Sequence, residues 1–208
     1  MSEDQMINMS SKKTLTQVAL LCCGFSGVLF ILIYAVFGFL TPGFNALRNT
    51  ISSLELVKNG WLQQANFMLY GVLSMLFTIG LSKELIKSAN AWYIVLFQLF
   101  ICAGSIGLAI CIHEPLHQIC NIIVFISVLV VLFLFAWQFY KTNSWKGWIV
   151  YSLVAAFMTM ALKAIFMLAV TYHHWPGLFE RLIFLPYNLW LFVLIIKLIS
   201  GRRLVAAG

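Results

Sequence analysis

The chain has 208 residues, of which 62% are hydrophobic and only 9% are charged, and its formal net charge is +7. Soluble domains carry about 25% charged residues, so this composition excludes a water-soluble globular protein. A net positive charge would suit a nucleic-acid partner, but the distribution of the basic residues, described below, argues against one.

Six long apolar stretches follow one another, separated by short polar loops. Each reaches the roughly 20 residues that a helix needs to cross a hydrocarbon core. The first stretch is too long for the apolar region of a cleaved signal peptide, and no small-residue cleavage site follows it. We therefore predict an all-α membrane protein, a bundle of six transmembrane helices that forms a single integral membrane domain over residues 1–208. The predicted spans are 15–40, 61–81, 91–112, 117–140, 147–171 and 178–198.

Basic residues are distributed unevenly among the loops. Nine lie at the N-terminus, in the even-numbered loops or at the C-terminus, and three lie on the other side. Because loops rich in Lys and Arg stay in the cytoplasm, we predict a multi-pass protein of the cell membrane with both termini cytoplasmic. The nine are Lys12, Lys13, Lys83, Lys87, Lys141, Lys146, Lys197, Arg202 and Arg203, and the three are Arg48, Lys58 and Arg181.

The first predicted outer loop, residues 41–60, has the pattern of a short amphipathic helix. Its apolar residues recur every three or four positions, and its polar residues form a second stripe opposite them. Such a helix lies in the membrane interface. It either only closes the bundle or turns its polar stripe toward a pocket. In the second case the residues that face the pocket are Arg48, Asn49, Ser52 and Glu55.

The stretch HEPLH, which begins at His113, matches the H-E-x-x-H pattern of zinc proteases. In those enzymes both histidines lie on one regular helix and reach one metal ion. Here Pro115 stands between them, and proline is tolerated in the first turn of a helix but not in its interior. We therefore expect the fourth span to begin near Pro115, which argues against a zinc protease. His113 and His117 could still bind zinc with His173 or His174 as a third ligand.

Lys163 lies inside the fifth span, in an apolar run. A lysine near the middle of a spanning helix costs about 2.5–3.5 kcal/mol on insertion scales, and such residues usually face the interior and form a pair. We expect an ion pair with Glu55, Glu114 or Glu180. The alternative is that the side chain extends along the helix to the lipid head groups.

Polar residues gather in the outer halves of the predicted spans. His117 and Asn121 are four residues apart and project from one side of the fourth helix. Glu180 and Arg181 lie near the start of the sixth, which Pro186 can bend. We therefore predict an outward-facing polar pocket. Its candidate ligand-binding residues are Arg48, Asn49, Ser52, Glu55, Glu114, His117, Asn121, Lys163, Glu180 and Arg181, and its candidate metal ligands are His113, His117 and His173.

Four short motifs occur in order along the chain. They are Ile51-Ser52-Ser53-Leu54, then Asn66 with Gly71, then Glu114 with His117, and finally Gly177-x-x-Glu180-Arg181 with Trp190 further along. With these motifs most of the chain resembles the small bacterial membrane proteins grouped as domain of unknown function 998. The resemblance implies a six-helix bundle in the bacterial inner membrane with an outward polar site, and it implies no activity.

The pocket is compatible with three functions. It could bind a lipid head group or a small anionic ligand through its basic residues. It could belong to an integral-membrane hydrolase that acts on lipid, with histidines on a metal ion and Glu114 or Glu180 as the general base. The protein could also be an accessory subunit whose polar residues only hold the bundle together, assembled as a homo-oligomer or with a partner membrane protein. The sequence leaves open whether the protein is an enzyme. We expect membrane lipids as partners and no cofactor other than a zinc ion.

Overall fold

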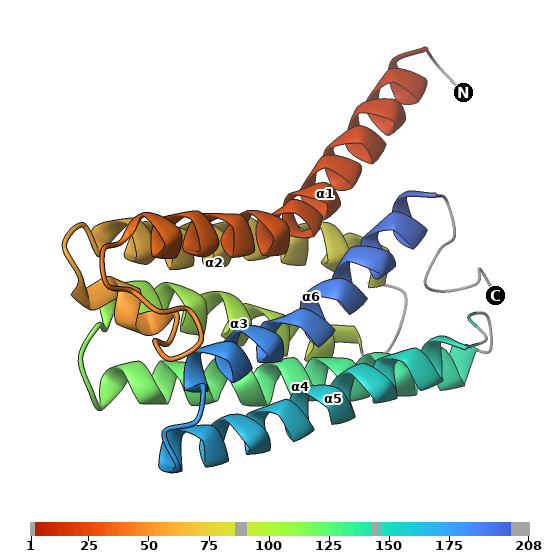
Figure 1. Cartoon of the computed structure of the whole chain (residues 1–208). Helices are drawn as coiled ribbons and strands as arrows, with labels where there is room; N and C mark the ends of the chain where they lie inside the picture. Colours follow the sequence, from red (N-terminus) through yellow and green to blue (C-terminus); the bar gives the residue numbers. More distant parts are fainter. Residues whose placement is uncertain (1–2, 86–90, 143–144, 146, 201–208) are drawn as a thin grey trace.

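The computed structural model describes residues 3–85, 91–142, 145 and 147–200, and these residues are helical with short connections (Figure 1). Six of the described helices are long and apolar enough to cross a membrane, as predicted, so the chain has the form of a multi-pass membrane protein. The elements are α1 (Glu3–Leu40), the 3-10 helix η1 (Ser52–Leu56), α2 (Trp61–Leu85), α3 (Ala91–Ile110), α4 (Leu116–Thr142), α5 (Trp148–Thr171) and α6 (Pro176–Ile199).

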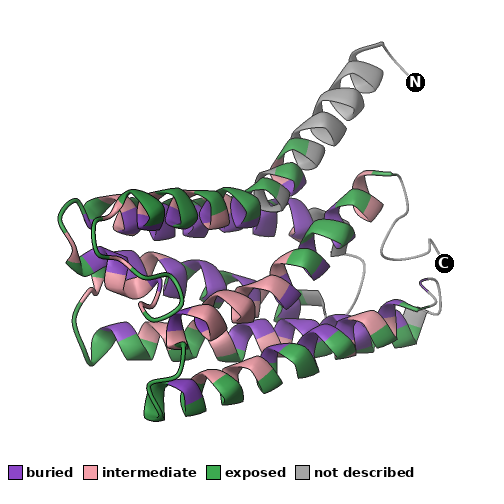
Figure 2. Cartoon of the chain, in the orientation of Figure 1, coloured by how far each residue is buried: buried purple, intermediate pink, exposed green. Residues whose placement is uncertain are grey.

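The six long helices form a closed ring in the order of the sequence. Each packs against its neighbours in the chain, and α6 also packs against α1. Residues 41–60, 111–115 and 172–175 connect the helices at one end of this ring, which we call the 41–60 end (Figure 1). In Figure 2 the buried parts of the ribbons lie mostly toward the interior of the ring and the exposed parts toward the outside. Because many of these exposed side chains are large and apolar, the outer surface suits contact with lipid.

Close helix packing depends on glycine at two of the helix interfaces. Lipid tails are as apolar as leucine, so helices in a membrane associate largely through van der Waals contact and small residues. A Cβ at Gly71 of α2 would lie 3.1 Å from the carbonyl oxygen of Cys102 on α3. A Cβ at Gly104 of α3 would lie 3.2 Å from the carbonyl oxygen of Cys120 on α4. Larger residues at either position would push the helices apart.

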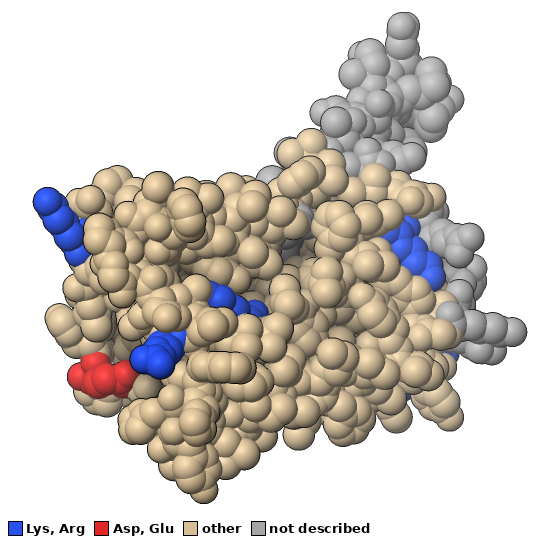
Figure 3. Space-filling model, in the orientation of Figure 1, with Lys and Arg blue, Asp and Glu red and all other residues tan. Residues whose placement is uncertain are grey.

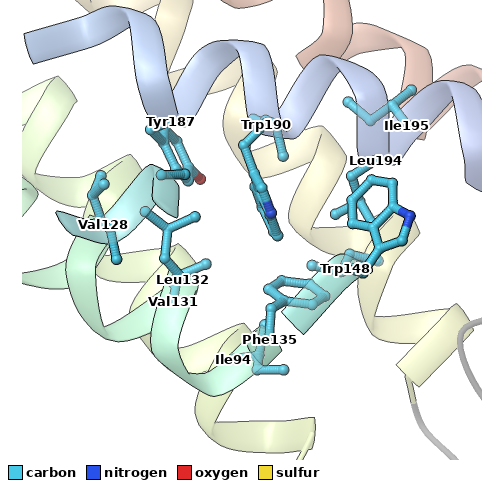
Figure 4. Packing of buried hydrophobic residues seen from close by; sticks show 14 of the residues in the cluster. Ile94, Val128, Val131, Leu132, Phe135, Trp148, Tyr187, Trp190, Leu194 and Ile195 are labelled. Carbon is cyan, nitrogen blue, oxygen red and sulfur yellow. The ribbon is translucent and has the colours of Figure 1, made fainter. Parts of the chain in front are cut away.

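Aromatic side chains fill the interior of the ring away from the 41–60 end (Figure 4). Trp190 of α6 is fully buried, and its Nε1 donates a hydrogen bond to Ser152 Oγ of α5 at 3.0 Å. Its ring meets that of Phe135 on α4 edge-on, with centroids 5.0 Å apart, and stacks with Tyr187 at 6.2 Å. This packed core forms the floor beneath the cavity described below.

The segment 41–60 differs from the amphipathic α-helix that its spacing suggests. It folds as turns followed by the five-residue 3-10 helix η1. Ile51 and Leu54 are fully buried, and Glu55 is only 5% exposed. The segment is therefore drawn into the end of the ring, with apolar and polar residues buried together. Contact of this segment with the membrane interface stays a prediction.

The orientation in the membrane also stays a prediction. Of the charged side chains that the structure describes, Lys141 and Lys197 lie toward the end opposite the 41–60 end, and Arg48, Lys58 and Arg181 lie toward the 41–60 end. The visible face of the molecule is almost uncharged along the helices, and the acidic atoms visible on it lie at the 41–60 end (Figure 3). The other basic residues used for the orientation, Lys12, Lys13, Lys83, Lys87, Lys146, Arg202 and Arg203, lie outside the residues whose side chains are described.

Candidate functional site

A cavity of about 70 Å³ lies inside the ring, and residues of all six long helices line it. This volume is enough for a few water molecules or for a small ligand group. Five phenylalanines contribute to the lining, so most of the wall is apolar. The main polar lining residues are Tyr70, Asn121, Thr159, Lys163, Glu180 and Asn188.

Lys163 is half-buried on α5 and lines the cavity. Nζ donates a long hydrogen bond of 3.4 Å to Asn121 Oδ1 on α4. It also lies 5.4 Å and 5.1 Å from the ring centroids of Phe125 and Phe166. The expected ion pair is absent: among the described side chains, no carboxylate lies within ion-pair distance of Nζ. Glu180 lines the same cavity and attracts the ammonium from a greater distance.

Glu180 does not reach Lys163 because its carboxylate is turned toward the loop. Its Oε2 accepts a hydrogen bond from the backbone N–H of Ile51, and the residue is only 8% exposed. One turn earlier in α6, Gly177 allows the loop to approach closely, since a Cβ there would lie 2.2 Å from the carbonyl oxygen of Asn49. Glu180 therefore holds the loop against α6 through this hydrogen bond, and it also lines the cavity.

Arg181, the next residue, binds the same loop through its backbone carbonyls. Its Nη1 donates to the carbonyl oxygens of Ala46 at 2.7 Å, Asn49 at 3.0 Å and Gly177 at 2.6 Å. The guanidinium carbon lies 5.5 Å from the ring centroid of Tyr34. These contacts make Arg181 a clamp between α6 and the loop. They also explain why the loop does not form a regular α-helix, because α6 bonds its backbone groups.

A second polar cluster joins η1 to the first turn of α4. His117 Nδ1 lies 3.7 Å from Glu55 Oε2 and 3.0 Å from the carbonyl oxygen of Cys111. Because a carbonyl can only accept, Nδ1 carries a proton, and in the neutral imidazole Nε2 is then an acceptor. In the described part of the chain, neither Nε2 nor Glu55 Oε1 has a hydrogen-bond partner.

Protonation of Glu55 decides whether this cluster is an ion pair. Burial of the carboxyl, and then the negative charge of Glu180, raises the pKa of Glu55 from 4.5 to about 8. Glu55 is therefore largely protonated at neutral pH, and its contact with His117 does not need two opposite charges.

Seven of the ten predicted ligand-binding residues do not line the cavity: Arg48, Asn49, Ser52, Glu55, Glu114, His117 and Arg181. Arg48 and Glu114 are exposed. Asn49 Oδ1 accepts a hydrogen bond of 2.8 Å from the backbone N–H of Asn45, within the loop itself. Of the predicted ligand-binding residues, Asn121, Lys163 and Glu180 line the cavity.

The three predicted zinc ligands are not brought together. His113 and His173 are exposed, whereas His117 is buried. Over the described residues, no three His, Cys, Asp or Glu side chains are grouped in a way that could hold a metal ion. As expected from Pro115, α4 begins at Leu116, so His113 lies in the preceding connection and His117 in the first turn.

Sequence reasoning missed Tyr70 as part of the cavity wall. Its hydroxyl donates to Asn188 Oδ1 of α6 at 3.3 Å, and Asn188 Nδ2 donates to the carbonyl oxygen of Phe184 at 2.7 Å. The signal was present in α2, because Gln63, Asn66 and Tyr70 are spaced by three and four residues and share one face of a helix. All three are buried.

Comparison with known proteins gives one family. A family model described as Protein of unknown function (DUF998) matches residues 25–197 of the chain. No curated protein and no solved structure matches it. The matched region includes the cavity and the Glu55–His117 cluster.

Proposed function

We propose that the cavity binds an amphipathic ligand with a small anionic group. The chain belongs to the DUF998 family of proteins of unknown function. The anionic group would lie at the Lys163 ammonium, and the apolar part of the ligand would lie against the phenylalanines of the wall. The observation that carries the proposal is that Lys163 lines the cavity while, among the described side chains, no carboxylate lies within ion-pair distance of its Nζ.

The cost of a buried charge supports an anionic ligand. A lysine inside a spanning helix costs roughly 2.5–3.5 kcal/mol on insertion scales, and one long hydrogen bond to Asn121 offsets only part of it. An ammonium has three N–H donors, so the bond to Asn121 leaves donors for a ligand oxygen. At an effective dielectric constant of about 20, two opposite charges about 4 Å apart attract by roughly 4 kcal/mol. An anionic group would therefore be favoured at this position.

The rest of the lining supports an apolar ligand body. Ligand sites are mostly apolar, with a few placed polar groups that fix the orientation of the ligand. Here Phe30, Phe67 and Phe184 surround the interior, and Asn188 and Tyr70 add polar edges. Lipids and lipid-derived acids combine these two features. The bias of basic residues among the loops supports a 41–60 end that faces outward in a bacterial inner membrane.

Ligand titration tests this proposal. The purified protein in nanodiscs is titrated with octanesulfonate, which is anionic, and with octyltrimethylammonium, which has a similar chain and a cationic head. We expect binding of octanesulfonate, an affinity loss of about tenfold or more in Lys163→Met, and retention in Lys163→Arg. Lys197→Met is the matched control, because Lys197 contacts Trp145 and Trp148 far from the cavity. Equal affinity for both amphiphiles, or unchanged affinity in Lys163→Met, would refute the proposal.

An integral-membrane hydrolase is the second candidate, favoured by the geometry of His117. A buried imidazole that donates from Nδ1 and keeps Nε2 as an acceptor has the form of a general base, and Nε2 is unpartnered among the described residues. Hydrolysis of p-nitrophenyl octanoate by the wild type but not by His117→Gln would support this candidate. Equal rates in the two proteins would remove it.

A further inference from the structure

The half of α5 nearest the 41–60 end is loosely packed. The buried residues of α5 are Trp148, Ser152, Ala155, Ala156, Thr159 and Ala169. The small residues up to Thr159 let α5 approach its neighbours, but residues 160–168 contain no buried side chain. In Figure 1 the ribbon of α5 diverges from that of α4 toward the 41–60 end. The half of α5 beside the cavity therefore buries fewer side chains than its other half.

Lys163 and two aromatic rings occupy this part of the interface. Phe125 belongs to α4 and Phe166 to α5, and the Lys163 ammonium lies within 5.4 Å of both ring centroids. All three residues line the cavity, and all three are partly exposed. The same side chains thus border the interior of the ring and its outer surface.

Further along the same interface, the two helices are in direct aromatic contact. Phe133 of α4 and Phe157 of α5 meet edge-on, with centroids 6.0 Å apart. At Phe125 and Phe166 the contact runs through the ammonium instead. An ammonium on a flexible side chain can move aside more easily than two interlocked rings.

Two other routes into the cavity are obstructed. From the 41–60 end, the fully buried Ile51 and Leu54 pack against Phe30 and Leu108, and Glu180 fastens that loop. Between α1 and α6, the side chain of Asn188 lies against Gly27, where a Cβ would lie 2.4 Å from Asn188 Oδ1. Across the α4–α5 interface beside the cavity, the contact is the long hydrogen bond of 3.4 Å from Lys163 Nζ to Asn121 Oδ1.

The size of the cavity indicates how a ligand would occupy it. Pockets that enclose a whole drug-sized ligand measure about 300–1,000 Å³, whereas this cavity measures about 70 Å³. Only a head group, or a short part of a longer molecule, fits inside. The remainder of an amphipathic ligand must extend out of the ring, and the outer surface beside Phe125 and Phe166 faces the bilayer.

We infer that the ligand enters sideways from the bilayer, between α4 and α5, through a portal formed by Phe125, Lys163 and Phe166, and that it is a membrane lipid with an anionic head group. Its head group lies at the Lys163 ammonium, and its acyl chain passes between the two rings into the surrounding lipid. This inference rests on the proposed function and adds the source of the ligand, which is the membrane and not the aqueous phase.

Photolabelling from within the bilayer tests the portal. The whole chain is placed in phosphatidylcholine nanodiscs that contain a phosphatidic acid with a diazirine in its acyl chain. After irradiation, labelled peptides are mapped by mass spectrometry. We expect labels to concentrate on α4 and α5 around Phe125 and Phe166, and to fall about tenfold in Lys163→Met. Phe157→Ala, which changes the same interface away from the cavity, should label like the wild type.

Two outcomes would overturn the portal. One is labelling that is spread over all helices and is equal in the wild type and Lys163→Met. The other is removal of the labels by inorganic phosphate in the aqueous phase, which would mean that the site fills from water. If octanesulfonate still binds with Lys163 dependence in either case, the portal fails alone and the proposed function stands. Lys163→Arg should keep the labelling, which separates loss of the charge from misfolding.

Discussion

The carboxylate of Glu180 accepts a hydrogen bond from the backbone N–H of Ile51, although 129 residues separate the two in the chain. The same carboxylate belongs to the cavity wall. Glu180 thus connects the cavity directly to the segment that covers the 41–60 end of the ring. The four predictions below test this connection, the cluster beside it and the lysine across the cavity.

Substitution of Glu180 should separate its role as an acceptor from its charge. Glu180→Ala leaves the buried N–H of Ile51 without a partner, which costs about 1–3 kcal/mol. Glu180→Gln keeps a carbonyl acceptor and should cost less. The midpoint of thermal unfolding in detergent, followed by tryptophan fluorescence, measures both. Glu114→Ala is the control, because Glu114 is exposed. Equal losses in the Ala and Gln variants would contradict the assigned bond.

Close contact between α6 and the loop predicts a strong effect at Gly177. A Cβ at this position would lie 2.2 Å from the carbonyl oxygen of Asn49 and 2.7 Å from that of Ala46. Gly177→Ala should therefore displace the loop and weaken the Arg181 clamp. Limited proteolysis should show faster cleavage within residues 41–60. Glu114→Ala, at an exposed residue outside this segment, should leave the cleavage unchanged, and comparable cleavage in both variants would count against the clamp.

The raised pKa of Glu55 predicts that the free energy of unfolding decreases as pH rises. Its pKa is raised from 4.5 to about 8, first by burial and then by the charge of Glu180. Between these two values the folded protein binds more protons than the unfolded chain, so the free energy of unfolding falls as pH rises from about 4.5 to about 8. Above about pH 8 this contribution is lost.

Thermal unfolding across this pH range provides the measurement. Glu55→Gln mimics the protonated carboxyl, so its unfolding midpoint should change less with pH and should exceed that of the wild type at alkaline pH. The exposed Glu114→Gln should keep the wild-type dependence. An identical pH dependence in the wild type and Glu55→Gln would show that Glu55 does not carry this effect.

Elements governed by local pattern could be predicted from the sequence. The six spans follow from apolar length, and the start of α4 follows from the restriction that Pro115 imposes. The spans of the structure, Val18–Leu40, Trp61–Ser82, Trp92–Ile110, Leu116–Lys141, Trp148–Thr171 and Pro176–Ile199, lie within a few residues of the predicted ones.

Contacts between distant segments could not be predicted in the same way. Lys163 was expected to pair with an acid, but its Nζ bonds to Asn121, and the Glu180 carboxylate bonds to the backbone of Ile51. The turn structure of segment 41–60 depends on Glu180 and Arg181, which bond its backbone from the other end of the chain. The side-chain periodicity within that segment carries no information about those bonds. For this reason the sequence alone predicted an α-helix there.

The substitution Lys163→Met should raise the stability of the protein and lower its affinity for an anionic ligand. If its ammonium serves a ligand, Lys163→Met removes a costly charge from a membrane helix and should raise the unfolding midpoint of the ligand-free protein. The same variant should lose octanesulfonate binding, as residues retained for function often reduce stability. Lys163→Arg should keep both properties near the wild type, and Asn121→Leu should lower the unfolding midpoint by removing the acceptor for Nζ. A lysine that only holds the bundle together would behave differently, because Lys163→Met would then lower the midpoint and leave binding unchanged.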